Sequence, residues 1–120
     1  MSDDYHYTIF PNIQLNILAD ECWVFRQLPH PQDPDCMIFD FHIYRALQEG
    51  QERPPRPETQ FGKGASFSLN NEVLDQDAQN LPGVQQGMHS DGFEGFWLSD
   101  QERRIRHFHH TLVAYLAENT

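Results

Sequence analysis

The stretch MIFDFHIY, residues 37–44, alternates between two sets of side chains. A period of two is typical of a β-strand, in which successive side chains point to opposite faces of the sheet. We therefore predict a strand from about Cys36 to Leu47. One face of this strand would carry Met37, Phe39, Phe41 and Ile43, and the other Ile38, Asp40, His42 and Tyr44.

Two further strands are predicted upstream of this stretch. Residues 22–28 place Trp23 and Phe25 on one side of a strand, and residues 7–17 alternate in the same way. Pro11 interrupts the second pattern and predicts an edge position or a bulge within that strand, because proline cannot donate to the ladder. Residues 29–35 hold three prolines and two aspartates, which favours a rigid connecting loop. Short connections of this kind predict an antiparallel meander of about three strands.

The second half of the chain is predicted to be helical. It follows a polar, proline-rich loop at about residues 48–63, which we expect to be flexible. Asn70 and Asn71 are candidate caps for a helix in which Pro82 should produce a kink or start a second segment. Ser99 and Glu102 form a capping-box pattern before a last helix. Its apolar stripe is Ile105, Phe108, Leu112, Tyr115 and Leu116, and Arg103, Arg104 and Arg106 are expected on its solvated face. The predicted fold class is α+β, as a single domain over residues 1–120.

Composition narrows the range of partners. The 120-residue chain has a formal net charge of −10 and only eight Lys and Arg residues, which argues against nucleic acid and anionic membranes as partners. No stretch approaches a membrane span, and residues 1–4 do not resemble a signal peptide, so we expect a cytoplasmic location. Cys22 and Cys36 do not form a C-x-x-C pair, which leaves a thiolate zinc site unsupported and favours free thiols.

Two groups of residues resemble one known family. The first group is Tyr5–Ile13, continuing to Phe25-Arg26 and Pro29-His30-Pro31. The second is Val73–Asp77, Val84–Met88, Ser90, Gly92-Phe93, Gln101-Glu102 and His107–His109. Together they are similar to the C-terminal part of the catalytic domain of the Rieske non-haem iron aromatic-ring-hydroxylating oxygenase alpha subunit. The resemblance implies a helix-grip fold of the START-like kind, in which a curved antiparallel sheet wraps a long helix around a cavity.

The resemblance also implies an iron site. In that family two histidines and one carboxylate hold Fe(II), and Asp77 matches the carboxylate position, with Asp75 as the fallback. The histidines come from a D-x-x-H-x-x-x-x-H segment. Asp3 and His6 supply its first half, but Pro11 stands where the second histidine should be. The motifs of the 2Fe–2S cluster, C-x-H and C-x-x-H, are absent from this chain. Fe(II) is therefore not expected to be held by this chain alone.

Other candidate residues have structural alternatives. Gln85 could line the same cavity as Asp77 or brace its helix, and Trp23, Phe25, Phe39 and Phe41 could line an apolar cavity or form a core. His107 and His110 would share a helix face, but no third metal ligand is evident.

Two functions remain open at this point. In the first, the chain is an oxygenase fragment, inactive alone, that acts on a small apolar or aromatic substrate when joined to its missing half. In the second, it is a non-catalytic small-molecule-binding or assembly module that forms a homo-oligomer. The thin predicted sheet is consistent with either kind of partner.

Overall fold

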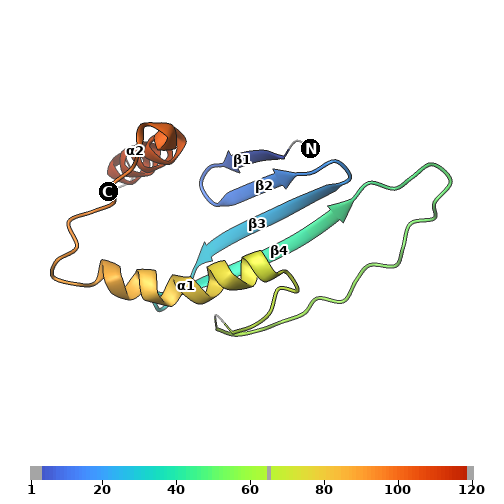
Figure 1. Ribbon diagram of the computed structural model, residues 1–120, viewed down its shortest axis with the longest axis horizontal. Coiled ribbons are helices and arrows are strands. Elements are labelled where there is room, and N and C mark those ends of the chain that lie inside the picture. The colour runs from blue at the N-terminus through green and yellow to red at the C-terminus, as the bar shows by residue number, and fades with distance from the viewer. Residues whose placement is uncertain (1–3, 65, 119–120) are drawn as a thin grey trace. The chain divides into compact units, whose positions relative to one another are not determined.

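The computed structural model describes residues 4–64 and 66–118. Asp3, the first residue of the D-x-x-H match, lies outside them, as do Met1 and Ser2. The chain divides into two compact units, Met1–Arg53 with Leu98–Thr120, and Pro54–Trp97. Figure 1 labels the helices and strands of both units. No helix among the described residues combines the length and the apolar character needed to cross a membrane.

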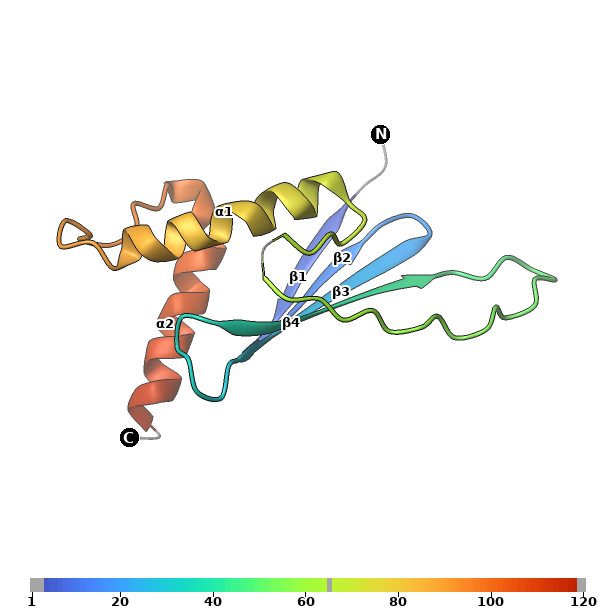
Figure 2. The same ribbon diagram turned by 90° about the horizontal axis from the view of Figure 1, so that it is seen from below.

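The first unit is built on a four-stranded antiparallel sheet. Its strands are β1 (Tyr5–Ile9), β2 (Ile13–Ile17), β3 (Glu21–Pro29) and β4 (Met37–Arg45). They lie side by side in chain order, as Figures 1 and 2 show. The predicted antiparallel meander is therefore confirmed, and four short or medium strands replace the expected three.

The additional strand arises at Pro11, where the prediction of one strand over residues 7–17 was wrong. Residues 10–12 form a turn, and Ile9 pairs directly with Ile13 across it. The Phe10–Pro11 peptide is cis. Because Pro11 has no N–H for a ladder, the chain reverses there instead of continuing as one interrupted strand.

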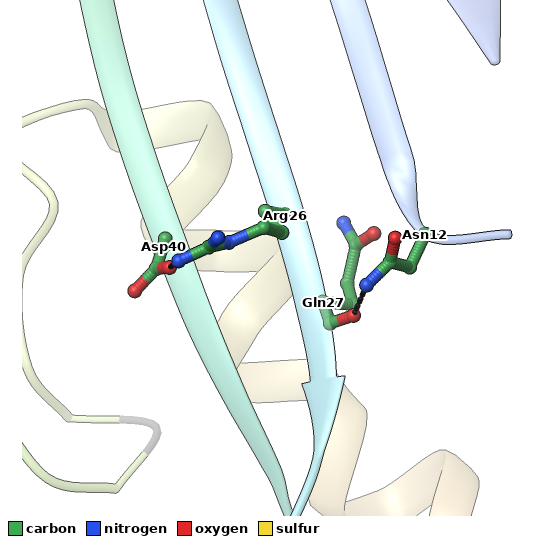
Figure 3. Close-up of polar contacts among 4 residues, drawn as sticks. All are labelled: Asn12, Arg26, Gln27 and Asp40. Carbon is green, nitrogen blue, oxygen red and sulfur yellow. Dashed lines mark hydrogen bonds and ion pairs between the residues drawn. The ribbon is translucent and has the colours of Figure 1, made fainter. Parts of the chain in front are cut away.

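The side chain of Asn12 ties this turn to β3. Its Nδ2 donates to the carbonyl oxygen of Gln27 at 2.8 Å (Figure 3). The Gln27 N–H donates back to the Asn12 carbonyl oxygen at 3.1 Å. Two bonds between the same residues fix the turn against the neighbouring strand. The β1–β2 hairpin is thus held against β3 by a side chain as well as by the β2–β3 ladder.

Register and alternation divide the sheet into two faces. Phe25 pairs with Phe41 and Trp23 with Ile43, so the predicted aromatic sets of β3 and β4 share one face. We call Trp23, Phe25, Phe39 and Phe41 the aromatic face. On the opposite face Arg26 pairs with Asp40 across β3 and β4, and its Nε donates to Asp40 Oδ2 at 2.9 Å (Figure 3).

Helix α2 (Arg103–Glu118) completes the first unit. It follows the 3-10 turn η1 (Asp100–Glu102), and the predicted capping box is present, with the Ser99 N–H donating to Glu102 Oε2 at 2.6 Å. The Phe10 ring lies 5.9 Å from Phe108 and 5.6 Å from Tyr115, measured between ring centroids. The apolar stripe of α2 therefore contacts the sheet unit at the β1–β2 turn.

Arg106 does not lie on a fully solvated helix face as predicted. It is half-buried, and its guanidinium donates to the backbone carbonyl oxygens of Leu98, Ser99 and Asp100 at 3.3, 2.9 and 3.4 Å. These carbonyl groups precede the helix and lie one to two turns from Arg106, within reach of its long side chain. Arg103 and Arg104 are exposed, as expected.

The second unit contains helix α1 (Glu72–Met88). Of the two predicted caps, Asn71 is the N-cap, and its side-chain oxygen accepts from the N–H groups of Val73 and Leu74 at 3.1 Å each. The helix continues through Pro82, so the predicted alternative of a second segment is wrong. No helix or strand occurs among the described residues between β4 and α1, in agreement with the loop predicted there.

Candidate functional site

Asp75, the fallback ligand, is engaged in local structure at the start of α1. Its carboxylate accepts from the Ser68 hydroxyl and from the Leu69 N–H, both at 2.6 Å. The Ser68 hydroxyl oxygen in turn accepts from the Asn70 N–H at 3.0 Å. These bonds, that of Ser68 first, hold the pKa of the Asp75 carboxyl below its ordinary value, because they stabilise the ionised form. Both carboxylate oxygens thus accept hydrogen bonds from the segment that leads into α1.

Asp77, the predicted iron ligand, lies two residues further along α1 and is exposed. A separation of two residues places its side chain on a different side of the helix from Asp75. Among the contacts of the described residues, Asp77 makes no hydrogen bond or ion pair. Of the two aspartates, Asp77 therefore has the carboxylate that a ligand from solution can reach.

Gln85 is half-buried on the same helix. Its Nε2 lies 3.3 Å from His89 Nε2, a separation typical of a side-chain pair at positions i and i+4. This contact supports the interpretation that Gln85 braces the C-terminal end of α1. It does not test whether Gln85 also lines a cavity.

The four aromatic candidates lie together in the first unit. Phe25 and Phe41 are stacked with ring centroids 5.0 Å apart and an angle of 6° between their planes. Phe39 extends the stack, at 5.9 Å from Phe25, and Trp23 meets Phe41 edge-on at 5.7 Å and 75°. Phe25, only 6% exposed, is the buried hydrophobic residue of the described chain, and the other three rings are partly exposed. The aromatic face is therefore partly core and partly open surface.

Glu21 is a residue of this face that the sequence reasoning missed. Its Oε2 accepts from the indole Nε1 of Trp23 at 2.8 Å, and its Oε1 accepts from Arg45 Nε at 2.7 Å. The hydrogen bond from Trp23, followed by that from Arg45 and its positive charge, lowers the pKa of Glu21. The available signal was the spacing Glu-x-Trp, because residues i and i+2 of a strand share a face.

Among residues 4–64 and 66–118, the histidines do not gather around a shared carboxylate. His6 Nε2 lies 3.0 Å from Asp4 on the exposed β1 strand, and His42 lies beside Tyr44 on β4. Within the part of the chain that the structure describes, no three His, Cys, Asp or Glu side chains are placed to hold a metal ion. Cys22 and Cys36 are not joined by a disulfide, and the Cys36 thiol donates to Asp33 Oδ2 at 3.2 Å. The donors present therefore do not by themselves fit a mononuclear iron centre of two imidazoles and one carboxylate.

The fold is α+β: a meander sheet with one aromatic face is followed in the chain by two helices, the first of which carries an exposed carboxylate. Its sequence matches, over residues 1–118, the family model described as ring hydroxylating alpha subunit (catalytic domain). The chain therefore belongs to this family of ring-hydroxylating oxygenases, which are oxidoreductases. The resemblance found in the sequence is confirmed. No curated protein and no solved structure gives a significant match.

Proposed function

We propose that this chain supplies the carboxylate side of a mononuclear Fe(II) site in a ring-hydroxylating oxygenase catalytic domain, with Asp77 as the ligand. The family match over residues 1–118 carries this proposal. The contrast between the two carboxylates supports the choice of residue, because Asp75 is bound to Ser68 and Leu69 whereas Asp77 is exposed and unbonded among the described residues. Binding of a metal ion by Asp77 would break none of the hydrogen bonds that hold the start of α1.

The two imidazole ligands would come from residues outside this sequence. Fe(II) held by two histidines and one carboxylate retains open positions at which dioxygen is activated. The chain alone would then be inactive, and it would need a polypeptide segment that carries D-x-x-H-x-x-x-x-H. The 2Fe–2S cluster that delivers electrons would also lie outside these residues. A cytoplasmic location is part of the same proposal.

The aromatic face would provide an apolar wall for a small apolar or aromatic substrate. Phe39 and Trp23 flank the stacked Phe25–Phe41 pair, and aromatic rings prefer offset-stacked or edge-to-face contacts of the kind seen among them.

Metal binding tests this proposal directly. Fe(II) affinity would be measured anaerobically by titration calorimetry for the chain alone, and for the chain mixed with a polypeptide that carries the D-x-x-H-x-x-x-x-H segment. We expect weak binding alone and tight binding in the mixture. Asp77→Asn should weaken the mixed site by more than about tenfold, since even outer-shell changes weaken metal sites by that much.

The matched control is Asp91→Asn, which removes an exposed carboxylate just beyond the C-terminal end of α1. It should leave Fe(II) affinity unchanged. Equal affinities for Asp77→Asn and the unmodified chain would overturn the assignment of Asp77. Tight Fe(II) binding by the chain alone would overturn the claim that the imidazoles lie elsewhere.

A second candidate function is favoured by the partly exposed aromatic face. The chain would be a non-catalytic small-molecule-binding or assembly module with a helix-grip-like cavity, completed by a second copy. Ile9, Tyr5 and Tyr7 of the edge strand β1 are each at least half exposed, at 50%, 53% and 52%. Mass measurement after size-exclusion chromatography, with an apolar fluorescent probe, tests this function. A stable monomer that binds no probe would count against it.

A further inference from the structure

We propose that Glu21 is a positioning residue that fixes the indole ring of Trp23 and thereby sets the outline of the aromatic face. Its consequence for ligand binding rests on the proposed function, in which the aromatic face binds an aromatic ligand. The positioning itself is a property of the sheet and can be measured without any ligand.

The geometry places Glu21 between two partners that use different oxygens. Glu21 opens β3 directly opposite Arg45, and Trp23 follows on the same face, opposite Ile43. One carboxylate oxygen accepts from the Trp23 indole at 2.8 Å and the other from Arg45 at 2.7 Å. The Glu21 side chain is 18% exposed and that of Arg45 is 74% exposed. The bond to the indole is therefore the better shielded of the two, since exposed ion pairs are weakened by water.

The two aromatic neighbours of the indole both meet it edge-on. Its ring meets Phe41 at 75° and Phe25 at 74°, while those two phenylalanines stack at 6° to each other. Edge-on contacts with the two parallel phenyl rings define the position of the indole. They allow more than one orientation of the indole about its side-chain torsion angles. The single N–H of the indole, held by Glu21, selects one rotation. That rotation decides how far the indole edge projects beside the Phe25–Phe41 stack.

Glu21 would act on ligand choice through Trp23 and not by touching the ligand. With the indole fixed, the face offers a stack of phenyl rings bounded by one perpendicular ring. With the indole released, the boundary would move and the face would fit flat aromatic ligands less well, because ordering the ring would then cost conformational entropy on binding.

Trp23 can be observed separately from the only other tryptophan, Trp97. Trp97 is 96% exposed, so Trp97→Phe removes its signal with little effect on packing. In this background, near-ultraviolet circular dichroism reports whether the Trp23 ring is held in one orientation. We expect Glu21→Ala to lose most of the indole band while far-ultraviolet dichroism, which reports the sheet and helices, stays unchanged.

Two further variants separate the contacts of Glu21. Glu21→Gln keeps an oxygen that can accept from the indole and should retain the band. Arg45→Met removes the exposed ion pair but leaves the bond from Trp23 to Glu21, and should also retain it. An unchanged indole band in Glu21→Ala would overturn the inference. So would an equal loss in all three variants, which would indicate a general loosening of the sheet end.

A ligand readout tests the consequence for binding. The probe is N-phenyl-1-naphthylamine, a neutral aromatic fluorophore that the net charge of the chain does not repel. Glu21→Ala should weaken its binding several-fold, and Glu21→Gln should not. Equal affinities for all variants would overturn the role in ligand choice. If neither the unmodified chain nor any variant binds the probe, the result would count against the proposal that the aromatic face binds a ligand. The circular dichroism of the Trp23 indole would still test whether Glu21 positions that ring.

Discussion

The ring of Phe10 meets the ring of Tyr115 edge-on, with centroids 5.6 Å apart and an angle of 69° between their planes. Phe10 belongs to the turn between the first two strands, and Tyr115 lies near the end of α2. Together with the contact of Phe10 with Phe108, this pair links the two ends of the chain within one unit. Because Phe10 contacts both Phe108 and Tyr115, its removal should lower the free energy of unfolding by a measurable amount.

Replacement of Phe10 tests this link between helix and sheet. Phe10→Ala should lower the free energy of unfolding by about 2 kcal/mol, because it removes two aromatic contacts and part of a half-buried side chain. Urea unfolding followed by far-ultraviolet circular dichroism gives the value. The control is Phe61→Ala, whose ring is 90% exposed and should cost less than about 0.5 kcal/mol. Equal losses in the two variants would contradict a specific role for Phe10.

The two asparagines before α1 should respond differently to substitution. Asn71 caps the helix, so Asn71→Ala should lower the free energy of unfolding by about 1 kcal/mol. Asn70 has a φ of 58°, in the left-handed region that glycine adopts readily, so Asn70→Gly should be close to neutral. Thermal unfolding of both variants, followed by circular dichroism, compares them. The assignment of the cap would be wrong if Asn70→Gly proved the more costly change.

Asp75 should make the stability of the chain depend on acid. Its pKa in the folded state is lowered by Ser68 and Leu69, so its contribution is fully present above the unfolded-state pKa of about 3.9. That contribution is lost as the pH falls through the lower folded-state pKa. The stability difference between the unmodified chain and Asp75→Asn should thus be largest near neutral pH and shrink in acid.

The control for this pH dependence is Ser68→Ala, which removes the donor that lowers the pKa of Asp75 most and should reduce the same acid dependence. Thermal midpoints measured from neutral pH down to about pH 2 cover this window, because an aspartate of lowered pKa titrates below the unfolded-state value of about 3.9. If the difference in thermal midpoint between the unmodified chain and Asp75→Asn stays constant over this window, Asp75 does not contribute pH-dependent stability.

Arg106 should stabilise the start of α2 through its bonds to backbone carbonyl groups. Arg106→Met keeps much of the apolar stem but removes the donors to Leu98, Ser99 and Asp100, and should cost about 1 kcal/mol. Arg104→Met removes an equal charge from an exposed position of the same helix and should change the stability by less than about 0.5 kcal/mol. Urea midpoints at two salt concentrations would separate a hydrogen-bonding role from general electrostatics. Matching losses for both arginines would exclude the specific role.

Several features of the fold could be predicted because their signals are local. The alternation of residues 37–44 predicts which side chains share a face, and the structure confirms this for Phe39 and Phe41. Ser99 with Glu102 predicts a capping box that spans four residues, and it is present. In each case the interacting groups lie two to four residues apart, so strand or helix geometry alone brings them together.

Features that depend on chain reversal or on distant partners were missed. The pattern over residues 7–17 has the period of one strand, and only the turn at Pro11 shows that it forms two. The solvated interpretation of Arg106 failed because its partners are backbone carbonyl oxygens, which leave no mark in the sequence. Glu21 gave a local signal, its spacing from Trp23, but its second partner Arg45 is defined only by the strand register.

The amino-acid sequence by itself determined the strand faces, the helix caps and the family, because these follow from residue order and short-range geometry. Only the tertiary structure showed that Asp75 is hydrogen-bonded while Asp77 is exposed. It also showed that the Glu21 carboxylate accepts the hydrogen bond from the indole of Trp23. The physical reason is that hydrogen bonds form wherever folding brings a donor and an acceptor within about 3 Å, and residue order does not reveal those distances for groups on separate segments.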